Sequence, residues 1–219
     1  MNRLAAFALS LLLGGCSSTG SSDYGQFYRA LRQSMTASFG NGRITKDQAA
    51  AIPYASIGYR LNDDAEQLLV LATDSNGEQL WTSASHIVIA TRGGRIVRTV
   101  GLPANVSAVT PGSGQILPPL SAALSGTVSY SRLEDLPDSQ VYGLTLACKI
   151  LYRGRQTIVI LGRGISTAKI DESCANRALN WSFTDSYWLD ADSGLAWKSI
   201  QHISPKKGKI EIEILRPPE

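Results

Sequence analysis

The amino-acid sequence predicts a mostly β protein, in which antiparallel hairpins and meanders form large curved or sandwiched sheets after short N-terminal helices. From Tyr54 onward, short runs of β-branched and aromatic residues alternate with close turn signals rich in glycine, asparagine and proline. The last run, Lys209-Ile-Glu-Ile-Glu-Ile-Leu215, alternates strictly, as a strand does when one face is buried and the other is solvated. Close turns between short strands favour antiparallel pairing throughout.

Residues 1–15 have the pattern of an export signal. Arg3 supplies a positive charge, and residues 4–13 form a ten-residue apolar run, too short for a bilayer, which takes about 20 apolar residues. The run ends in Leu13-Gly-Gly-Cys16, which resembles the lipobox at which bacterial lipoproteins are cleaved and lipidated on the cysteine. A plain secretory signal with an incidental cysteine is the alternative. We expect Cys16 to be lipidated.

The predicted lipid would anchor the chain to a membrane. One acyl chain holds marginally and several hold firmly, and a bacterial lipoprotein carries three. Ser17 stands where lipoproteins retained in the inner membrane have aspartate, so by analogy we expect the periplasmic side of the outer membrane. Residues 16–22 would be a lipidated tether of on the order of 13 Å. Residues 23–219 would then form a single domain close to that membrane.

Two helices are predicted before the strands begin. Apolar residues recur at helical spacing over residues 23–36, which predicts an amphipathic helix with a core-facing aromatic stripe. Thr45-Lys-Asp-Gln48 resembles a capping box, and it predicts a short helix through Ala51 that stops before Pro53.

The strands fall into two hairpin-rich halves, at about 54–102 and 126–215. In the first half, strands at 67–73 and 78–83 flank an Asn-Gly turn, and strands at 87–91 and 96–100 flank Arg92-Gly-Gly-Arg95. A Pro/Gly-rich loop, 103–125, joins the halves. In the second half, strands at 142–152 and 157–161 are expected to flank a turn at Arg153-Gly-Arg155. A C-terminal meander follows, with strands at 180–190, 195–204 and 209–215.

A short motif occurs once in each half. Trp81-Thr-Ser-Ala-Ser-His-Ile87 and Trp197-Lys-Ser-Ile-Gln-His-Ile203 both fit Trp-x-Ser-x-x-His-Ile, and they contain the only two histidines of the chain. The repeat indicates one hairpin unit used twice, with chance as the rival explanation. We expect His86 and His202 to be structural rather than a shared metal site.

The cysteine count predicts one disulfide. With Cys16 committed to lipid, Cys148 and Cys174 remain as an even pair in an oxidising compartment. Their spacing does not match a zinc site, and no other metal or cofactor is expected.

Enzyme motifs are largely absent. The sequence has no nucleophile elbow, zinc-protease, Walker or dinucleotide-binding pattern. Paired acids at Asp63-Asp64, Asp171-Glu172 and Asp190/Asp192 could serve a glycosidase, but each sits in or beside a turn signal, where carboxylates usually cap backbone groups. No catalytic residue is predicted.

The overall charge is too balanced to indicate a nucleic-acid partner, at +3 for the full chain. Residues 79–170 have an excess of positive charge, with nine basic residues against three acidic ones. The basic residues are Arg92, Arg95, Arg98, Arg132, Lys149, Arg153, Arg155, Arg163 and Lys169. A basic face would suit an acidic glycan or a lipid headgroup, whereas scattered solvated arginines are the alternative.

Tryptophans near the C-terminus add a second candidate feature. They could stack on sugar rings, although core packing explains them as well. The candidate contacts with a glycan or a protein partner are Arg92, Arg95, Arg153, Arg155, Trp188 and Trp197.

Several segments together resemble a known family. They are Ile52-Pro-Tyr-Ala-Ser56, Leu80-Trp-Thr-Ser-Ala84, Gly94-Arg-Ile-Val-Arg-Thr-Val-Gly-Leu102, Tyr187-Trp-Leu-Asp190, Ser193-Gly194 and Trp197-Lys-Ser-Ile-Gln-His-Ile-Ser-Pro205. In this order, and with the lipoprotein signal, they resemble the YjbF/GfcB lipoproteins encoded with exopolysaccharide and group 4 capsule export genes. Asp185 departs from the pattern, because the resemblance leads us to expect asparagine before the Tyr-Trp pair.

The resemblance implies a mostly β periplasmic domain on the outer membrane that aids polysaccharide assembly or export, with no established activity. We therefore expect a non-catalytic interaction or scaffold protein whose partners are an outer-membrane β-barrel or periplasmic export proteins. Direct binding of acidic polysaccharide by the basic, aromatic second half is one alternative. Enzymatic modification of polysaccharide is another.

Overall fold

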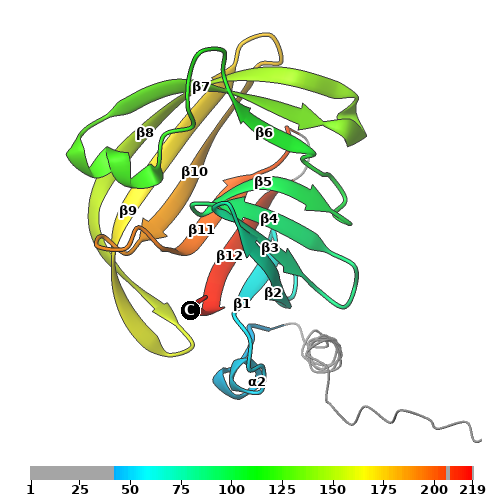
Figure 1. Ribbon diagram of the computed structural model, residues 1–219, viewed down its shortest axis with the longest axis vertical. Coiled ribbons are helices and arrows are strands. Elements are labelled where there is room, and N and C mark those ends of the chain that lie inside the picture. Colours follow the sequence, from blue (N-terminus) through cyan, green and yellow to red (C-terminus); the bar gives the residue numbers. More distant parts are fainter. Residues whose placement is uncertain (1–41, 206–207, 219) are drawn as a thin grey trace, which may run out of the picture.

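A computed structural model describes residues 42–205 and 208–218 (Figure 1). The described chain forms one antiparallel sheet of twelve strands, so the predicted mostly β fold of antiparallel hairpins and meanders is confirmed. The predicted helix at 23–36, Cys16 and the tether lie outside the described residues.

The elements follow the chain in a simple order. They are α2 (Lys46–Ala50), β1 (Ser56–Leu61), β2 (Gln67–Ser75), β3 (Glu78–Thr82), β4 (Val88–Arg92), β5 (Arg95–Val100), β6 (Ala108–Pro111), the 3-10 helix η1 (Leu120–Ser125), β7 (Val128–Leu136), the 3-10 helix η2 (Pro137–Ser139), β8 (Val141–Ile160), β9 (Arg163–Asn176), β10 (Trp181–Leu189), β11 (Ala196–His202) and β12 (Lys209–Arg216).

Two meanders are joined side by side in the sheet. Its strand order is β5-β4-β3-β2-β1-β12-β11-β10-β9-β8-β7-β6, so every neighbouring pair except β1–β12 is consecutive in sequence. The first and last strands pair antiparallel in the middle of the sheet, with Tyr59 opposite Ile212. The two meanders are therefore held together by backbone pairing between the two ends of the β domain.

The sheet curls until its two edges approach each other. Figure 1 shows β5 and β6, the outermost strands, lying near each other. The Thr99 N–H donates to the carbonyl of Val106 (2.8 Å), just before β6. The concave face encloses the main apolar core, in which Leu69, Trp81 and Ile170 are almost completely buried.

The sheet has a second apolar layer on its outer face. The helix α2 begins at the predicted capping box, where the Gln48 N–H donates to Thr45 Oγ1 (3.3 Å) and the Thr45 N–H donates to Gln48 Oε1 (2.8 Å). Ala49 of this helix packs with Leu68 and Val70 of β2. These contacts confirm the predicted helix and cover one part of the outer face.

The predicted turn at Arg153-Gly-Arg155 is wrong. β8 runs through it without interruption, and the register shifts between Tyr152 and Gly154, which marks a β-bulge. Gly154 has a φ of +109°, a conformation that serves a bulge as well as a turn. The chain reverses later, at Leu161 and Gly162, so β8 and β9 form one long hairpin.

The predicted loop at 103–125 contains regular structure. Residues 108–111 form β6, which pairs with β7 at the edge of the sheet, and residues 120–125 form η1. Leu120 and Ala123 of η1 are buried in the main core. Prolines and glycines therefore lie at the ends of short elements here, and the segment as a whole is not irregular.

Candidate functional site

A layer of charged side chains lies inside the curled sheet. The inward positions of β7 alternate with solvent-facing ones, and they carry Tyr130, Arg132 and Glu134. Two further strands, β9 and β10, which pair with each other, contribute Glu172 and Asp185 at directly opposite positions. All five are buried, so their charges and hydroxyls need partners within the protein.

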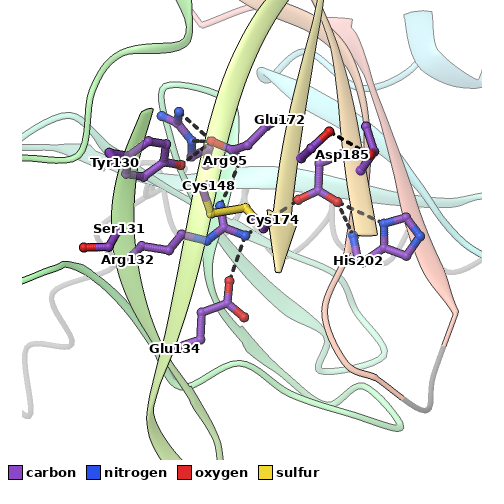
Figure 2. The surroundings of a disulfide bond; sticks show 12 residues. Arg95, Tyr130, Ser131, Arg132, Glu134, Cys148, Glu172, Cys174, Asp185 and His202 are labelled. Atoms are coloured by element: carbon purple, nitrogen blue, oxygen red, sulfur yellow. Dashed lines mark hydrogen bonds and ion pairs between the residues drawn. A yellow bond between two sulfur atoms is a disulfide. The ribbon is translucent and has the colours of Figure 1, made fainter. Parts of the chain in front are cut away.

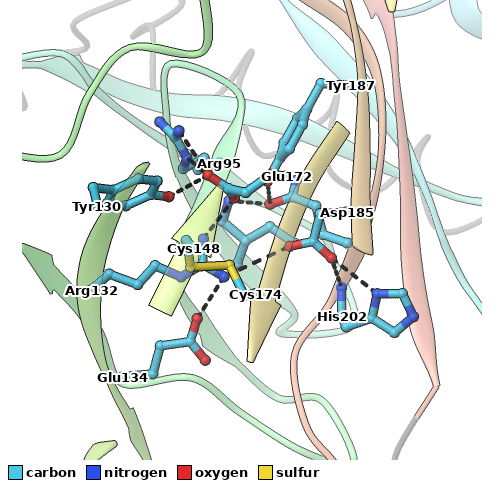
Figure 3. A network of polar contacts seen from close by, with 12 residues as sticks. Arg95, Tyr130, Arg132, Glu134, Cys148, Glu172, Cys174, Asp185, Tyr187 and His202 are labelled. Atoms are coloured by element: carbon cyan, nitrogen blue, oxygen red, sulfur yellow. Dashed lines mark hydrogen bonds and ion pairs between the residues drawn. A yellow bond between two sulfur atoms is a disulfide. The ribbon is translucent and has the colours of Figure 1, made fainter. Parts of the chain in front are cut away.

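Glu172 is the centre of this layer (Figure 3). The Arg95 Nε–H donates to Glu172 Oε1 (2.9 Å), and Arg132 Nη1 donates to Oε2 (2.8 Å). The hydroxyl of Tyr130 donates to Oε1, and that of Tyr187 donates to Oε2 (3.2 Å). Two cations and two hydroxyls from three strands, β5, β7 and β10, thus converge on one carboxylate.

These contacts keep Glu172 ionised. Burial alone would raise the pKa of Glu172, but the Arg132 and Arg95 guanidiniums outweigh it and hold the pKa at about 2. A carboxylate with so low a pKa is a poor proton donor or acceptor near neutral pH. The arrangement is therefore suited to joining strands.

A second carboxylate, that of Asp185, links the buried layer to the half-buried His202. Asp185 Oδ1 accepts the backbone N–H of His202 (2.8 Å) and contacts its Nδ1 (3.0 Å), while Asp185 Oδ2 lies 3.7 Å from Arg132 Nη2. Arg132 Nη2 also contacts Glu134 Oε1 at 2.8 Å. Burial raises the pKa of both Asp185 and Glu134, against the lowering effect of these partners. The layer therefore contains carboxyls whose pKa values are shifted in opposite directions: that of Glu172 is lowered, and those of Asp185 and Glu134 are raised.

The disulfide lies beside this network (Figure 2). Cys148 of β8 and Cys174 of β9 are directly opposite each other and are joined by a disulfide. Because Cys174 faces inward, Glu172 two residues earlier faces inward as well. From the sequence, Glu172 was expected in or beside a turn, so this role was missed, although the predicted disulfide could have indicated that Glu172 faces inward.

Arg95 is the first predicted contact residue whose place differs from the expectation. Its side chain is 3% exposed and bound to Glu172, so it cannot present its charge to a ligand at the surface. Arg92 and Arg153 do lie at the surface, where Arg92 pairs with Glu78 (3.0 Å) and Arg153 with Asp171 (2.8 Å). The predicted basic face is thus divided between interior and surface, and much of its charge is neutralised.

The two predicted tryptophans contribute mainly to packing on the outer face. Trp188 is 7% exposed, and its Nε1–H donates to Gln156 Oε1 (2.8 Å). It packs with Ile158 and Ile160, close to the tip of the long hairpin. Trp197 is half-buried and packs against both this cluster and the main core. The outward residues of the hairpin beyond the bulge thereby form an outer apolar cluster.

The two histidines occupy corresponding places in the chain but different surroundings. His86 is exposed, in the turn after β3, with a φ of +64°. His202 ends β11 and is held by Asp185. Within residues 42–205 and 208–218, no group of three or more His, Cys, Asp or Glu side chains is arranged to hold a metal ion.

Arg155, another predicted contact residue, lines an open cleft. The cleft has a volume of about 430 Å³ and lies between the outer half of the β8–β9 hairpin, η1 and the turn after β10. Besides Arg155 it is lined by Leu124, Tyr152, Ser166, Thr167, Ala168, Asp190, Ala191 and Asp192. The cleft brings together Arg155, predicted as a basic contact, with Asp190 and Asp192, predicted as turn carboxylates.

Comparison with known proteins assigns the family. The profile of the family described as "Group 4 capsule polysaccharide lipoprotein gfcB, YjbF" matches residues 31–215, most of the chain. The chain belongs to this family. Among its relatives in Escherichia coli (strain K12), the uncharacterized lipoprotein GfcB is 26% identical over 222 residues, which cover 99% of both chains. The uncharacterized lipoprotein YjbF is 25% identical over 217 residues, 99% of this chain and 98% of that protein.

A crystal structure shows the same fold. The hypothetical lipoprotein YmcC from Escherichia coli (K12) superposes with a TM-score of 0.69 at 24% identity, covering 86% of this chain and 94% of that chain. The resemblance stated from the sequence is therefore confirmed for the family and for the β fold. Across the part of the chain that the structure describes, no helix is long and apolar enough to cross a bilayer.

Proposed function

We propose that this member of the YjbF/GfcB family is an outer-membrane-anchored periplasmic lipoprotein that supports assembly or export of an exopolysaccharide or capsule as a non-catalytic interaction protein. The observation that carries the proposal is the family match over residues 31–215, whose description names a capsule polysaccharide lipoprotein. The lipobox-like sequence ending at Cys16 supports the anchor.

The buried charges support a non-catalytic role. A cluster of buried ionisable groups lies inside the sheet, where Glu172 is 0% exposed. Its carboxylate is occupied by Arg95, Arg132 and two tyrosine hydroxyls. These groups stabilise the fold, so a partner would be contacted through the outer surface. An outer-membrane β-barrel or periplasmic export proteins are the partners we propose.

Cellular polysaccharide tests the proposal. Deleting the gene should reduce or alter the surface polysaccharide, and Cys16→Ser should do the same because the chain would lose its acyl anchor. Ser17→Asp should redirect the lipidated chain to the inner membrane, and Ser17→Ala is the matched control. Surface polysaccharide is measured by extraction and sugar analysis, and the address of the chain by membrane fractionation.

The variants separate the parts of the proposal. Unchanged polysaccharide in the deletion strain would refute a role in export. A change in the deletion strain but not in Cys16→Ser or Ser17→Asp would refute the need for the outer-membrane anchor. Crosslinking in intact cells should join the wild-type chain to an export protein and should fail to do so with Ser17→Asp.

A further inference from the structure

The cleft beside Arg155 is built by three separate parts of the fold. The β8–β9 hairpin supplies Tyr152, Arg155 and Ser166, and the turn after β10 supplies Asp192. Its volume of about 430 Å³ lies within the range of about 300–1,000 Å³ that is usual for small-molecule sites. A single hollow thus combines one aromatic ring, one guanidinium, the hydroxyls of a serine and a threonine, and two carboxylates.

The bulge in β8 places the aromatic ring and the guanidinium on the same face. Residues three apart on a regular strand point to opposite faces. Here Tyr152 is opposite Ile170 and Arg155 is opposite Ala168, two residues apart on β9, so Tyr152 and Arg155 share a face. Gly154, at φ +109°, allows the extra residue. Bulges are often found where a strand re-aims side chains toward a site, and this one aims two at the cleft.

The lining groups are available to a ligand. Among the described residues, Arg155 and Asp192 make no ion pair or side-chain hydrogen bond, whereas neighbouring Arg153 is neutralised by Asp171 at 2.8 Å. Tyr152 is 37% exposed. The hollow thus contains an uncovered aromatic face flanked by one unpaired donor group and one unpaired acceptor group.

The acidic wall of the cleft is held in place by its own turn. Asp190 Oδ1 accepts the N–H groups of Asp192 (3.2 Å) and Ser193 (2.8 Å) and the Ser193 hydroxyl (2.8 Å). The backbone and side-chain hydrogen bonds from Ser193 lower the pKa of Asp190, so this carboxylate stays charged. Asp192 therefore lies in a turn that is already ordered, which lowers the entropic cost of binding a ligand.

We propose that this cleft binds a short, hydroxyl-rich segment of a neutral or sparsely charged saccharide. The ring of Tyr152 stacks on the apolar face of one sugar, Asp192 accepts hydrogen bonds from adjacent hydroxyls, and Arg155 donates to hydroxyl or ring oxygens. The inference rests on the proposed role in polysaccharide assembly or export and names the chemistry that the chain would recognise.

The local charge decides between a neutral and a strongly acidic saccharide. One cation, Arg155, faces two carboxylates, Asp190 and Asp192, so the cleft carries a net negative charge. A polyanion would be repelled, and the repulsion would grow at low salt. Hydroxyl groups both donate and accept hydrogen bonds, so they fit a cleft that has a donor in Arg155 and acceptors in the two carboxylates.

The test uses the whole mature chain, purified in a detergent whose headgroup contains no sugar. Surface polysaccharide from the producing cells is cut to oligosaccharides and separated by anion exchange into a neutral and an acidic fraction. Affinity for each fraction is measured by isothermal titration calorimetry at low and high salt. The neutral fraction should bind, with little dependence on salt.

Variants locate the site. Tyr152→Ala and Asp192→Asn should each weaken binding by about tenfold or more, equivalent to about 1.4 kcal/mol. Tyr142→Ala removes a tyrosine that is 67% exposed on the same strand outside the cleft, and it should bind as the wild type does. Arg155→Ala should weaken binding while Arg163→Ala, outside the cleft, should not. Circular dichroism checks that each variant is folded.

Several results would overturn the inference. Binding of the acidic fraction alone, weakened by salt, would replace the neutral saccharide with an acidic one. Equal loss in Tyr152→Ala and Tyr142→Ala, or no loss in either, would move the site elsewhere. No binding of either fraction would refute saccharide recognition. If surface polysaccharide still depends on the gene in that case, the export role stands and only the cleft assignment fails.

Discussion

At the scale of single residues, Glu172 and Asp185 lie opposite each other but differ in the groups that donate hydrogen bonds to them. Glu172 accepts hydrogen bonds from two guanidiniums and two hydroxyls. Asp185 chiefly accepts from His202, and the pKa of Asp185 is raised by burial. We expect Glu172→Gln to lower the free energy of unfolding by about 3–5 kcal/mol, because it leaves Arg95 and Arg132 undercompensated in the interior.

Asp185→Asn is the matched control for that substitution. An asparagine oxygen at position 185 can still accept from the His202 N–H, and the neutral amide avoids burying a charge, so we expect a change within about 1 kcal/mol. Urea unfolding followed by tryptophan fluorescence measures both. A larger loss in Asp185→Asn than in Glu172→Gln would show that Glu172 is not the centre of the network.

The same carboxylate predicts a pH dependence. The pKa of Glu172 is about 2 in the folded chain against 4.5 for an unperturbed glutamate, so its stabilisation is complete above about pH 4.5 and is lost as the pH falls toward 2. The raised pKa values of Asp185 and Glu134 act in the opposite sense. The wild type should therefore lose stability relative to Glu172→Gln by on the order of 3 kcal/mol across that window.

Unfolding curves of both proteins at matched pH values measure this difference. Taking the difference between the two proteins removes most of the contribution from groups that they share. A difference that stays constant between pH 4.5 and 2 would contradict the depressed pKa of Glu172.

At the scale of elements, the turn between β4 and β5 is packed against another strand. Gly94 has a φ of +86°, and a Cβ added there would lie 2.4 Å from the Cβ of Ala196 on β11. Gly77 has a similar φ of +74° with nothing within 4 Å. Gly77→Ala should therefore cost only the backbone strain, about 1 kcal/mol, whereas Gly94→Ala should cost about 1–3 kcal/mol more from overpacking.

Thermal unfolding of the two alanine variants separates strain from overpacking. Restoring space with Ala196→Gly in the Gly94→Ala background should recover part of the loss. Equal melting temperatures for Gly77→Ala and Gly94→Ala would contradict the close contact between this turn and β11.

Elements with local signals could be predicted from the sequence, and those with ambiguous signals could not. Thr45 and Gln48 form the capping box within one helical turn, and the Asn76-Gly77 turn depends only on its own residues. Gly154 was misread because a glycine with positive φ fits a turn and a bulge equally well. Only its pairing with β9 decides between them, and that pairing depends on residues farther along the chain.

Predicting the candidate site from the sequence would have required even more knowledge of long-range contacts than predicting the strands. Arg95 and Glu172 are 77 residues apart in the sequence, and nothing local distinguishes Arg95 from the exposed Arg92. Arg155 was predicted as a contact residue and Tyr152 was not, because the two share a face only through the bulge.

At the scale of the whole molecule, the pairing of β1 with β12 joins what the sequence separates. The first meander ends before position 103 and the second begins at β6, yet the sheet is continuous through the two terminal strands, with Ile57 opposite Ile214. The linker between the meanders is therefore not the only connection between them. β12 follows the other strands of the sheet in sequence and completes its middle, so we expect cooperative folding to require it.

Truncation tests this dependence. A chain ending after Gly208 lacks β12 and leaves β1 and β11 without a shared partner, exposing two rows of backbone donors and acceptors and the apolar side of Tyr59. We expect no cooperative unfolding transition by circular dichroism, whereas a chain ending after Arg216 keeps β12 and should melt within a few degrees of the wild type. A cooperative transition in the shorter chain at the wild-type temperature would show that each meander is stable by itself and that the β1–β12 pairing is dispensable.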